Sequence, residues 1–369
     1  MKRAILAGLA IAASFAAQAQ DTIVLGQSVA LTGPAQQLGL DMQAGARIYF
    51  DSVNAKGGVN GRKIVLKTLD DGYEPERAAA NTKKLINDEK VFALFGYVGT
   101  PTAAASMPIF TEAKVPFVGP FTGAELLRAP PNRNIFHVRA SYWDETEAIV
   151  QHLTAMSITR IAVFYQNDAY GKAGLTGVER ALKKRNMEIT ALGTVERNTV
   201  DVSKAVAEIA KANPQAIVMI SAYKSVAAFV RDMKKAGKTP SFWNVSFVGS
   251  KALASELKEE GRGVQISQVV PFPWDASIPV VKEYQKLLAD AKAGEPGFGS
   301  LEGFIAAKVM VEGLRRAGKN LTRESFIKAM ETMDPYDVGG FKVAYGVDNH
   351  NGSKYVDLTI ISKDGKFVR

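Results

Sequence analysis

Cysteine is absent from this sequence of 369 residues. The absence excludes disulfides, thiol chemistry and metal sites built on cysteine. It also removes the acceptor that a lipid anchor behind an N-terminal leader would need. A chain of this length can bury enough apolar surface to fold without disulfides. We therefore expect a protein that is stabilised by its core and carries no lipid anchor.

Histidine is scarce, and motifs typical of enzymes are missing. His137, His152 and His350 are scattered without the spacing of metal ligands. The triplet GKT at 237–239 is similar to the end of a phosphate loop, but Asp232 stands where that loop requires glycine. Neither G-x-G-x-x-G nor G-x-S-x-G occurs. We therefore expect no catalysis, no cofactor and no bound metal.

Long apolar runs are missing everywhere except at the N-terminus. There MKR is followed by AILAGLAIAASFAA and by AQA at 17–19, the pattern of a cleaved signal peptide. A membrane anchor is the alternative, but the run is short for a span and no stop-transfer pattern follows. We expect residues 1–19 to be removed and the mature protein to be soluble in the periplasm of a cell with two membranes.

Acidic residues are in the minority. Lys and Arg number 46 against 37 Asp and Glu, which gives a net charge of +9. The densest basic runs, at 182–185 and 233–235, fall late in predicted helices, where cations complement the helix dipole. No aromatic residues interleave them as they do in nucleic-acid-binding motifs. We therefore expect solvated helix faces and no nucleic-acid partner.

The sequence does contain a regular alternation of strand and helix patterns. Strands are expected at 22–31, 62–71, 91–96, 115–120, 135–141, 158–166, 188–196, 216–223 and 241–249. Helical patterns separate most of them. Two consecutive units of repeated βα elements predict an α/β protein with two open parallel sheets.

Three further helices are expected with no strands between them, at 279–293, 300–318 and 322–333. Such helices must pack on a sheet that is already built, so we expect the chain to cross back and both lobes to be discontinuous. The expected lobes, joined by a hinge, are 20–140 plus 271–342 for lobe 1 and 141–270 plus 343–369 for lobe 2. Two open sheets that face each other leave a cleft along their strand ends, where ligands bind.

Six segments, taken together, are specific enough to indicate a family. They are ALTGPAQQLG (30–39), NAKGGVNGRKIVL (54–66), DDGYEPERA (70–78), PFTGAEL (120–126), QNDAYGKAG (166–174) and RDMKKAGKTPSFW (231–243). In this order the chain resembles the type I periplasmic binding proteins of the leucine/isoleucine/valine-binding branch. The resemblance implies a solute receptor without catalysis that works with an ABC permease in the inner membrane. We expect a monomer, because the cleft itself is the working surface.

Two strand–helix junctions of lobe 1 offer donors for a ligand carboxylate. A helix N-terminus supplies free N–H groups, Gly99 allows close backbone approach, and Thr100 adds a hydroxyl. By resemblance, the carboxylate is gripped at these two junctions, which carry Tyr97, Gly99, Thr100, Pro120, Phe121 and Thr122. Plain helix capping is the alternative for Thr100 and Thr102.

Lobe 2 is expected to cover the ligand. By resemblance, Tyr170 and Tyr223 close over it, whereas the alternative is two ordinary surface tyrosines. Leu38 stands where the family places an aromatic contact, which implies a pocket of different shape.

Position 246 departs from the family pattern. Amino-acid-binding relatives carry a glutamate there that neutralises the ligand ammonium, but this chain has Ser246 and no carboxylate from 241 to 250. A buried ammonium without a carboxylate is costly. Glu302 is the best substitute, with Asp144 and Asp275 as weaker ones. Compensation of the helix dipole is the alternative role for Glu302.

Two ligand classes therefore stay open. One is a branched-chain or related amino acid, and the other is an aromatic or aliphatic organic acid without an amino group. A sensor that presents its ligand to a membrane receptor is the alternative to import. In each case we expect hinge closure, in which the ligand first meets the 99–122 surface and lobe 2 then covers it.

Overall fold

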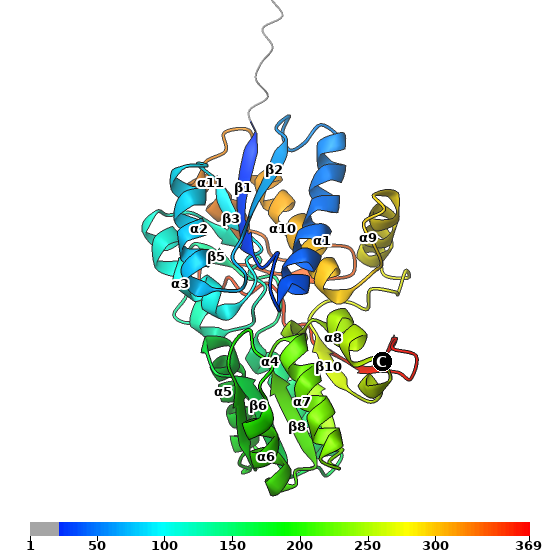
Figure 1. Ribbon diagram of the computed structural model, residues 1–369. Helices are drawn as coiled ribbons and strands as arrows, with labels where there is room; N and C mark the ends of the chain where they lie inside the picture. Colours follow the sequence, from blue (N-terminus) through cyan, green and yellow to red (C-terminus); the bar gives the residue numbers. More distant parts are fainter. Residues whose placement is uncertain (1–21) are drawn as a thin grey trace, which may run out of the picture.

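The computed structural model describes residues 22–369, so the expected signal peptide lies outside the described residues. The chain forms two lobes, each built on its own sheet (Figure 1). We name the five-stranded sheet with its helices lobe 1, and the seven-stranded sheet with its helices lobe 2. The predicted α/β class with open parallel sheets is confirmed.

Lobe 1 has an entirely parallel sheet in the order β2-β1-β3-β4-β5. Its strands are β1 (Ile23–Val29), β2 (Ile64–Asp70), β3 (Ala93–Phe95), β4 (Phe117–Val118) and β5 (Ile135–Phe136). The helices between them are α1 (Gln36–Ala55), α2 (Pro75–Asn87), α3 (Thr100–Glu112) and the short η1 (Glu125–Leu127). The strand β3 is buried and wholly apolar because helices cover both faces of a parallel sheet, whereas the buried part of β1 also includes Gln27 and Ser28.

Lobe 2 has the strand order β14-β13-β10-β9-β8-β6-β7. Its strands are β6 (Ile161–Gln166), β7 (Leu192–Val195), β8 (Ala216–Ile220), β9 (Ser241–Asn244), β10 (Gln265–Gln268), β13 (Asp357–Ile361) and β14 (Phe367–Val368). The last two strands of the chain run antiparallel to their neighbours and the others run parallel. The helices are α4 (Tyr142–Ala155), α5 (Ala169–Lys183), α6 (Ser203–Ala212), α7 (Tyr223–Lys235), α8 (Ser250–Leu257), η2 (Ser246–Val248) and η3 (Lys258–Gly261).

The three late helices pack in lobe 1. They are α9 (Pro279–Asp290), α10 (Phe298–Ala317) and α11 (Arg323–Glu331), followed by the paired strands β11 (Tyr336–Asp337) and β12 (Lys342–Val343). In Figure 1, α10 lies beside α1, and the two helices pack together. Their backbones approach closely at two glycines. A Cβ on Gly45 would lie 1.7 Å from the Ser300 carbonyl oxygen, and one on Gly303 would lie 2.3 Å from that of Met42.

Three segments lead from one sheet to the other, at 137–141, 269–278 and 344–356. The first and third run side by side, because the His137 N–H donates to the His350 carbonyl at 2.9 Å and the Gly352 N–H donates to the His137 carbonyl at 2.8 Å. These crossings lie near the expected lobe boundaries, which stay a proposal.

The strand expected over 241–249 is too long. β9 ends at Asn244, and a 3-10 turn over Ser246–Val248 follows. The Ser246 N–H donates to the Glu145 carboxylate at 2.7 Å instead of to a neighbouring strand, and Gly249 adopts a φ of 82°. The chain therefore leaves the sheet after Asn244, where it passes Glu145 on α4.

Candidate functional site

The two strand–helix junctions of lobe 1 lie next to each other. The Gly99 N–H donates to the Phe121 carbonyl at 3.2 Å, and Gly99 has a φ of 107°, which favours glycine. The hydroxyls of Thr100 and Thr122 hydrogen-bond at 2.6 Å, and both side chains are buried. Pro120 precedes Phe121 on the second junction. The structure thus brings together two of the expected hydroxyls from positions 22 residues apart.

Thr102 and Tyr97, which lie close to the junctions in sequence, form hydrogen bonds inside lobe 1. The Thr102 hydroxyl donates to the carbonyls of Val98 at 2.6 Å and Gly99 at 3.0 Å, and no side chain of the described residues caps the start of α3, so the alternative of helix capping is wrong for Thr102. The Tyr97 side chain points into the core, where its hydroxyl lies 3.0 Å from the Thr82 hydroxyl. The expected contact of Tyr97 with a ligand is therefore corrected, because its polar group already has a buried partner.

Aromatic rings of lobe 2 face the junctions. The Phe247 ring centroid lies 4.5 Å from that of Tyr170 and 5.5 Å from that of Phe121 in lobe 1. The ring of Tyr142, at the start of α4, lies tilted against that of Tyr170 with 5.4 Å between the centroids, and the Thr122 hydroxyl donates to the Tyr142 hydroxyl at 3.4 Å. Within residues 22–369, the buried Tyr170 hydroxyl has no hydrogen-bond partner. An aromatic wall thus covers the paired threonines.

A buried ionic cluster lies where the chain first crosses between the lobes. Arg139, in the crossing segment, donates from Nη2 to the Glu145 carboxylate at 3.0 Å and to the Ser246 hydroxyl. Glu145 also accepts from the Ser246 N–H at 2.7 Å and from the Ser267 hydroxyl at 2.6 Å. On the other side, Arg139 Nη1 lies 3.5 Å from Glu302 Oε1. One guanidinium therefore faces a carboxylate from each lobe.

Burial and neighbouring charges act differently on the pKa of Glu302 and on that of Arg139. Burial raises the pKa of Glu302 to about 7; the Arg139 guanidinium opposes this rise and Glu145 adds to it. Burial also works against the charged form of Arg139, but Glu302 and Glu145 together hold its pKa above the usual value. The guanidinium therefore stays charged, whereas Glu302 changes charge near neutral pH.

Ser246 thus has a carboxylate beside it, that of Glu145, which the sequence did not indicate. Glu145 comes from α4 and touches both the backbone and the side chain of Ser246. The two weaker candidates are occupied elsewhere. Asp144 forms a capping box with Ser141 at the start of α4, and Asp275 accepts from the N–H and hydroxyl of Ser277 on the surface.

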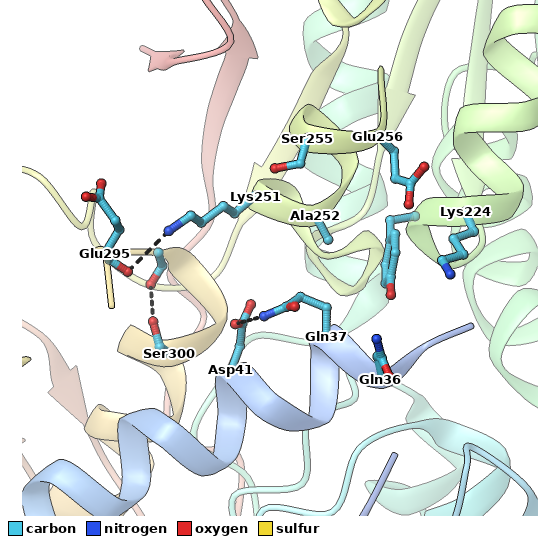
Figure 2. Close-up of a pocket in the computed structure, with 12 residues that line it drawn as sticks. Gln36, Gln37, Asp41, Lys224, Lys251, Ala252, Ser255, Glu256, Glu295 and Ser300 are labelled. Carbon is cyan, nitrogen blue, oxygen red and sulfur yellow. Dashed lines mark hydrogen bonds between the residues drawn. The ribbon is translucent and has the colours of Figure 1, made fainter. Parts of the chain in front are cut away.

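An open cavity of about 330 Å³ lies between the lobes (Figure 2). Gln37 and Asp41 on α1 face Lys251 on α8 across it, and Tyr223 at the start of α7 also lines it. Gln37 Nε2 donates to the Asp41 carboxylate at 2.7 Å. Burial raises the pKa of Asp41, while the Gln37 hydrogen bond and Lys251 oppose the rise.

A narrow cavity of about 10 Å³ shares Asp41 and Lys251 with the open one. It is also bordered by Leu38, Phe121, Ser246 and Glu302. Most of the expected site residues therefore lie at one of two places, the paired threonines or these two cavities. We name the narrow space the inner cavity.

Sequence reasoning missed several residues of this region. Arg139 stands inside the apolar run IFHVRAS, and a charged residue within such a run was a usable signal. In the sequence pattern, Glu145 and Asp41 cannot be told apart from ordinary polar residues on amphipathic helices. Phe247 directly follows Ser246, but only the early end of β9 turns its ring toward lobe 1.

Within residues 22–369, no group of three or more His, Asp or Glu side chains could hold a metal ion. In the same range, no helix has both the length and the apolar character that crossing a membrane requires.

The chain is similar to known proteins over almost its whole length. A family model described as periplasmic binding protein matches residues 22–366. A solved structure of a possible leucine/isoleucine/valine-binding protein from Rhodopirellula baltica SH 1 is 34% identical, covers 95% of this chain and 97% of its own, and has a TM-score of 0.91. A substrate-binding periplasmic protein from Ralstonia solanacearum is 35% identical, with coverages of 94% and 99% and a TM-score of 0.88. The Leu/Ile/Val-binding protein homolog 7 of Brucella abortus (strain 2308) is 25% identical over 96% of this chain and 92% of its own.

Proposed function

The chain belongs to the periplasmic binding protein family, and we propose that it is a periplasmic receptor that delivers a small carboxylate ligand to an ABC permease. The observation that carries the proposal is the pairing of Thr100 and Thr122 at two helix-starting junctions, opposite Tyr170 and Phe247 of the other lobe. Hydroxyls and free N–H groups at such junctions suit a carboxylate. The aromatic wall would exclude water from it.

Ligand capture by closure follows from this arrangement. The ligand first meets the junctions of lobe 1, and Tyr170 and Tyr223 of lobe 2 then close over it. We take the lobes as 20–140 with 271–342 and 141–270 with 343–369, because the crossing segments lie near these boundaries. The closed form is the one that the permease would recognise.

The leading ligand is a branched-chain or related amino acid, and the second is an organic acid without an amino group. The second class is favoured by the Arg139–Glu145 pair, which leaves no free acid at Ser246. Solved structures with the same fold include one from Thermus thermophilus with bound valine and one from R. palustris in complex with benzoate, at 19% and 21% identity. Both classes therefore belong in the test.

A thermal-shift screen of the purified protein tests the receptor function. The panel holds L-leucine, L-valine and L-phenylalanine, their amine-free counterparts 4-methylpentanoate, 3-methylbutanoate and 3-phenylpropanoate, and benzoate. A ligand at 100 times its dissociation constant should add about 2.7 kcal/mol of stability. L-leucinamide, which lacks the carboxylate, is the control and should not stabilise the protein. If no carboxylate in the panel raises the melting temperature, the proposed ligand class is wrong.

A further inference from the structure

The loop at 70–74, which follows β2 in lobe 1, is held in place by hydrogen bonds within that lobe. The Asp70 carboxylate accepts from three backbone N–H groups. The Asp71 carboxylate accepts from the Ser28 hydroxyl at 2.7 Å and from the Tyr73 N–H at 2.8 Å. Tyr73 has a φ of 64°, which a bulky residue adopts only where its surroundings impose it. The loop is therefore fixed by lobe 1 itself.

A turn that follows β7 in lobe 2 faces this loop. The Thr199 N–H closes the turn by donating to the Glu196 carbonyl at 3.2 Å. The Ser225 hydroxyl on α7 donates to the Thr199 carbonyl at 2.9 Å, which ties the turn to its own lobe. Asn198 has a φ of 61°, and asparagine is one of the few residues that adopt this conformation readily. The turn is therefore fixed by lobe 2, as the loop is by lobe 1.

Two side chains of the turn bridge the lobes. Arg197 Nη2 donates to the Glu74 carboxylate at 3.0 Å, and Asn198 Nδ2 donates to the same carboxylate at 2.7 Å. Asn198 Nδ2 also donates to the Gly72 carbonyl at 3.1 Å. All three hydrogen bonds join lobe 2 to lobe 1, so each of them breaks when the lobes separate. We name Gly72, Glu74, Arg197 and Asn198 the latch.

The ion pair of the latch is partly shielded from water. The Arg197 side chain is 23% exposed and that of Glu74 is 38% exposed. Asp168, which caps α5 in lobe 2, lies 3.5 Å from Arg197 Nη1 and helps to orient the guanidinium. The pair is exposed enough to be screened by salt, and the neighbouring hydrogen bonds give it a defined geometry.

The latch lies beside the ligand junctions but borders neither cavity. The Tyr73 ring, from the same loop as Glu74, packs on Gly99, because a Cβ on Gly99 would lie 2.3 Å from Tyr73 Cε2. No latch residue lines the open cavity or the inner cavity. Contacts that join the lobes without touching the ligand act only on the balance between the open and closed forms.

We propose that the latch holds the lobes together independently of the ligand, so that Glu74, Arg197 and Asn198 are positioning residues that raise ligand affinity from outside the site. The effect on affinity rests on the proposed receptor function, whereas the effect on closure does not. A fraction of the empty molecules is then closed, and breaking the latch makes that form rarer. Because an ion pair is part of the latch, salt should open the lobes as well.

Pulsed electron paramagnetic resonance measures the distance between the lobes without any ligand. Since the chain has no cysteine, spin labels can be attached at Lys83→Cys on α2 and Glu208→Cys on α6, which are exposed positions in different lobes. We expect a short and a long distance in the empty protein. Glu74→Ala and Arg197→Ala should each lower the short-to-long ratio about fivefold, and the double variant should lower it by less than the product of the two.

Two further measurements separate the latch from a general loss of stability. Raising NaCl from about 20 mM to about 500 mM should lower the ratio in the labelled protein but not in its Arg197→Ala variant. Arg197→Lys, which keeps the charge, should restore part of the short distance. In calorimetry, Arg197→Ala should weaken the binding of L-leucine and of benzoate by the same factor wherever both bind, because the latch touches neither.

Arg185→Ala is the matched control. Arg185 pairs with Glu147 at 2.8 Å with side chains that are 22% and 30% exposed, but both residues belong to lobe 2. It should change neither the distances nor the affinities. The proposal is overturned if Glu74→Ala and Arg197→Ala keep the short-to-long ratio of the labelled protein, or if Arg185→Ala lowers it equally. Either result leaves the receptor function intact, whereas distances that respond as expected without binding of any carboxylate would support the latch and contradict the receptor.

Discussion

Thr122 lies where three hydroxyl groups meet. Its Oγ1 pairs with Thr100 at 2.6 Å, donates to Tyr142 at 3.4 Å and accepts from the Ala124 N–H at 3.2 Å. A ligand carboxylate could replace the Thr100–Thr122 hydrogen bond by accepting from both hydroxyls. This makes Thr122 the best single residue with which to test the site.

We therefore expect Thr122→Ala to weaken ligand binding by about 1–3 kcal/mol, because a buried charged acceptor loses a donor. Calorimetry with the ligand from the screen measures the change. Thr102→Ala is the control, since the Thr102 hydroxyl is used by the backbone of its own helix. It should lower stability and leave the affinity unchanged. An unchanged affinity in Thr122→Ala would remove that residue from the site.

Glu302 also makes the stability of the empty protein depend on pH. Its pKa is about 7 in the folded state and near 4.5 when unfolded. Between these values the folded state keeps a proton that the unfolded state has lost. The free energy of unfolding should therefore fall as pH rises from 4.5 to 7, by up to about 1.4 kcal/mol per pH unit, relative to Glu302→Gln. Urea titrations of both proteins at several pH values measure this, and parallel curves would contradict the raised pKa.

Residues of the site differed in how far sequence could predict them. Thr100 and Thr122 each follow a strand of the predicted parallel sheet, so their meeting was predictable. The partners of Arg139 were not, because Glu145 and Glu302 come from helices of different lobes and meet only through the crossing. The prediction for Tyr97 was wrong because its place beside the junction does not show which way the side chain points, and its ring lies in the core.

At the level of elements, α1 and α10 are held at unusually close range. Gly45 and Gly303 allow this, since a Cβ at either position would collide with the other helix's backbone. The sequence predicted a helix over 300–318 and helical patterns between most of the strands. It did not predict the contact between α1 and α10, because a helical pattern does not show which helix packs against which.

Gly45→Ala should lower the free energy of unfolding by about 1–3 kcal/mol, because the added methyl group overpacks the α1–α10 contact. Denaturant titration measures the loss. Gly346→Ala is the control, since a Cβ there would meet no atom within 4 Å and should change stability little. Equal effects of the two substitutions would show that the helices adjust without cost.

At the level of the whole molecule, the lobes touch in the described structure. Rings of Phe121 and Phe247 meet between them, and Gln166 of lobe 2 donates to the Tyr73 hydroxyl of lobe 1 at 3.2 Å. Opening must separate these contacts. The two-lobed plan followed from the strand–helix alternation and the unpaired late helices, whereas the degree of closure depends on side-chain contacts that no periodicity reveals.

Ligand binding should therefore shift the population toward the compact form. Small-angle X-ray scattering should show a smaller radius of gyration with saturating ligand than without it. Thr122→Ala at the same ligand concentration should show less compaction, because fewer molecules hold ligand. Scattering curves that coincide with and without bound ligand would argue against hinge closure.

The order of the strands has a consequence for the timing of folding. Lobe 1 needs α10, which ends at Ala317, and lobe 2 needs β13 and β14, whose last residue is Val368. Each lobe therefore takes in a segment that comes late in the chain. Without β13, the edge of β10 would have free N–H and C=O groups, which invite aggregation. Assembly of lobe 2 is therefore complete only when the last two strands of the chain have joined its sheet.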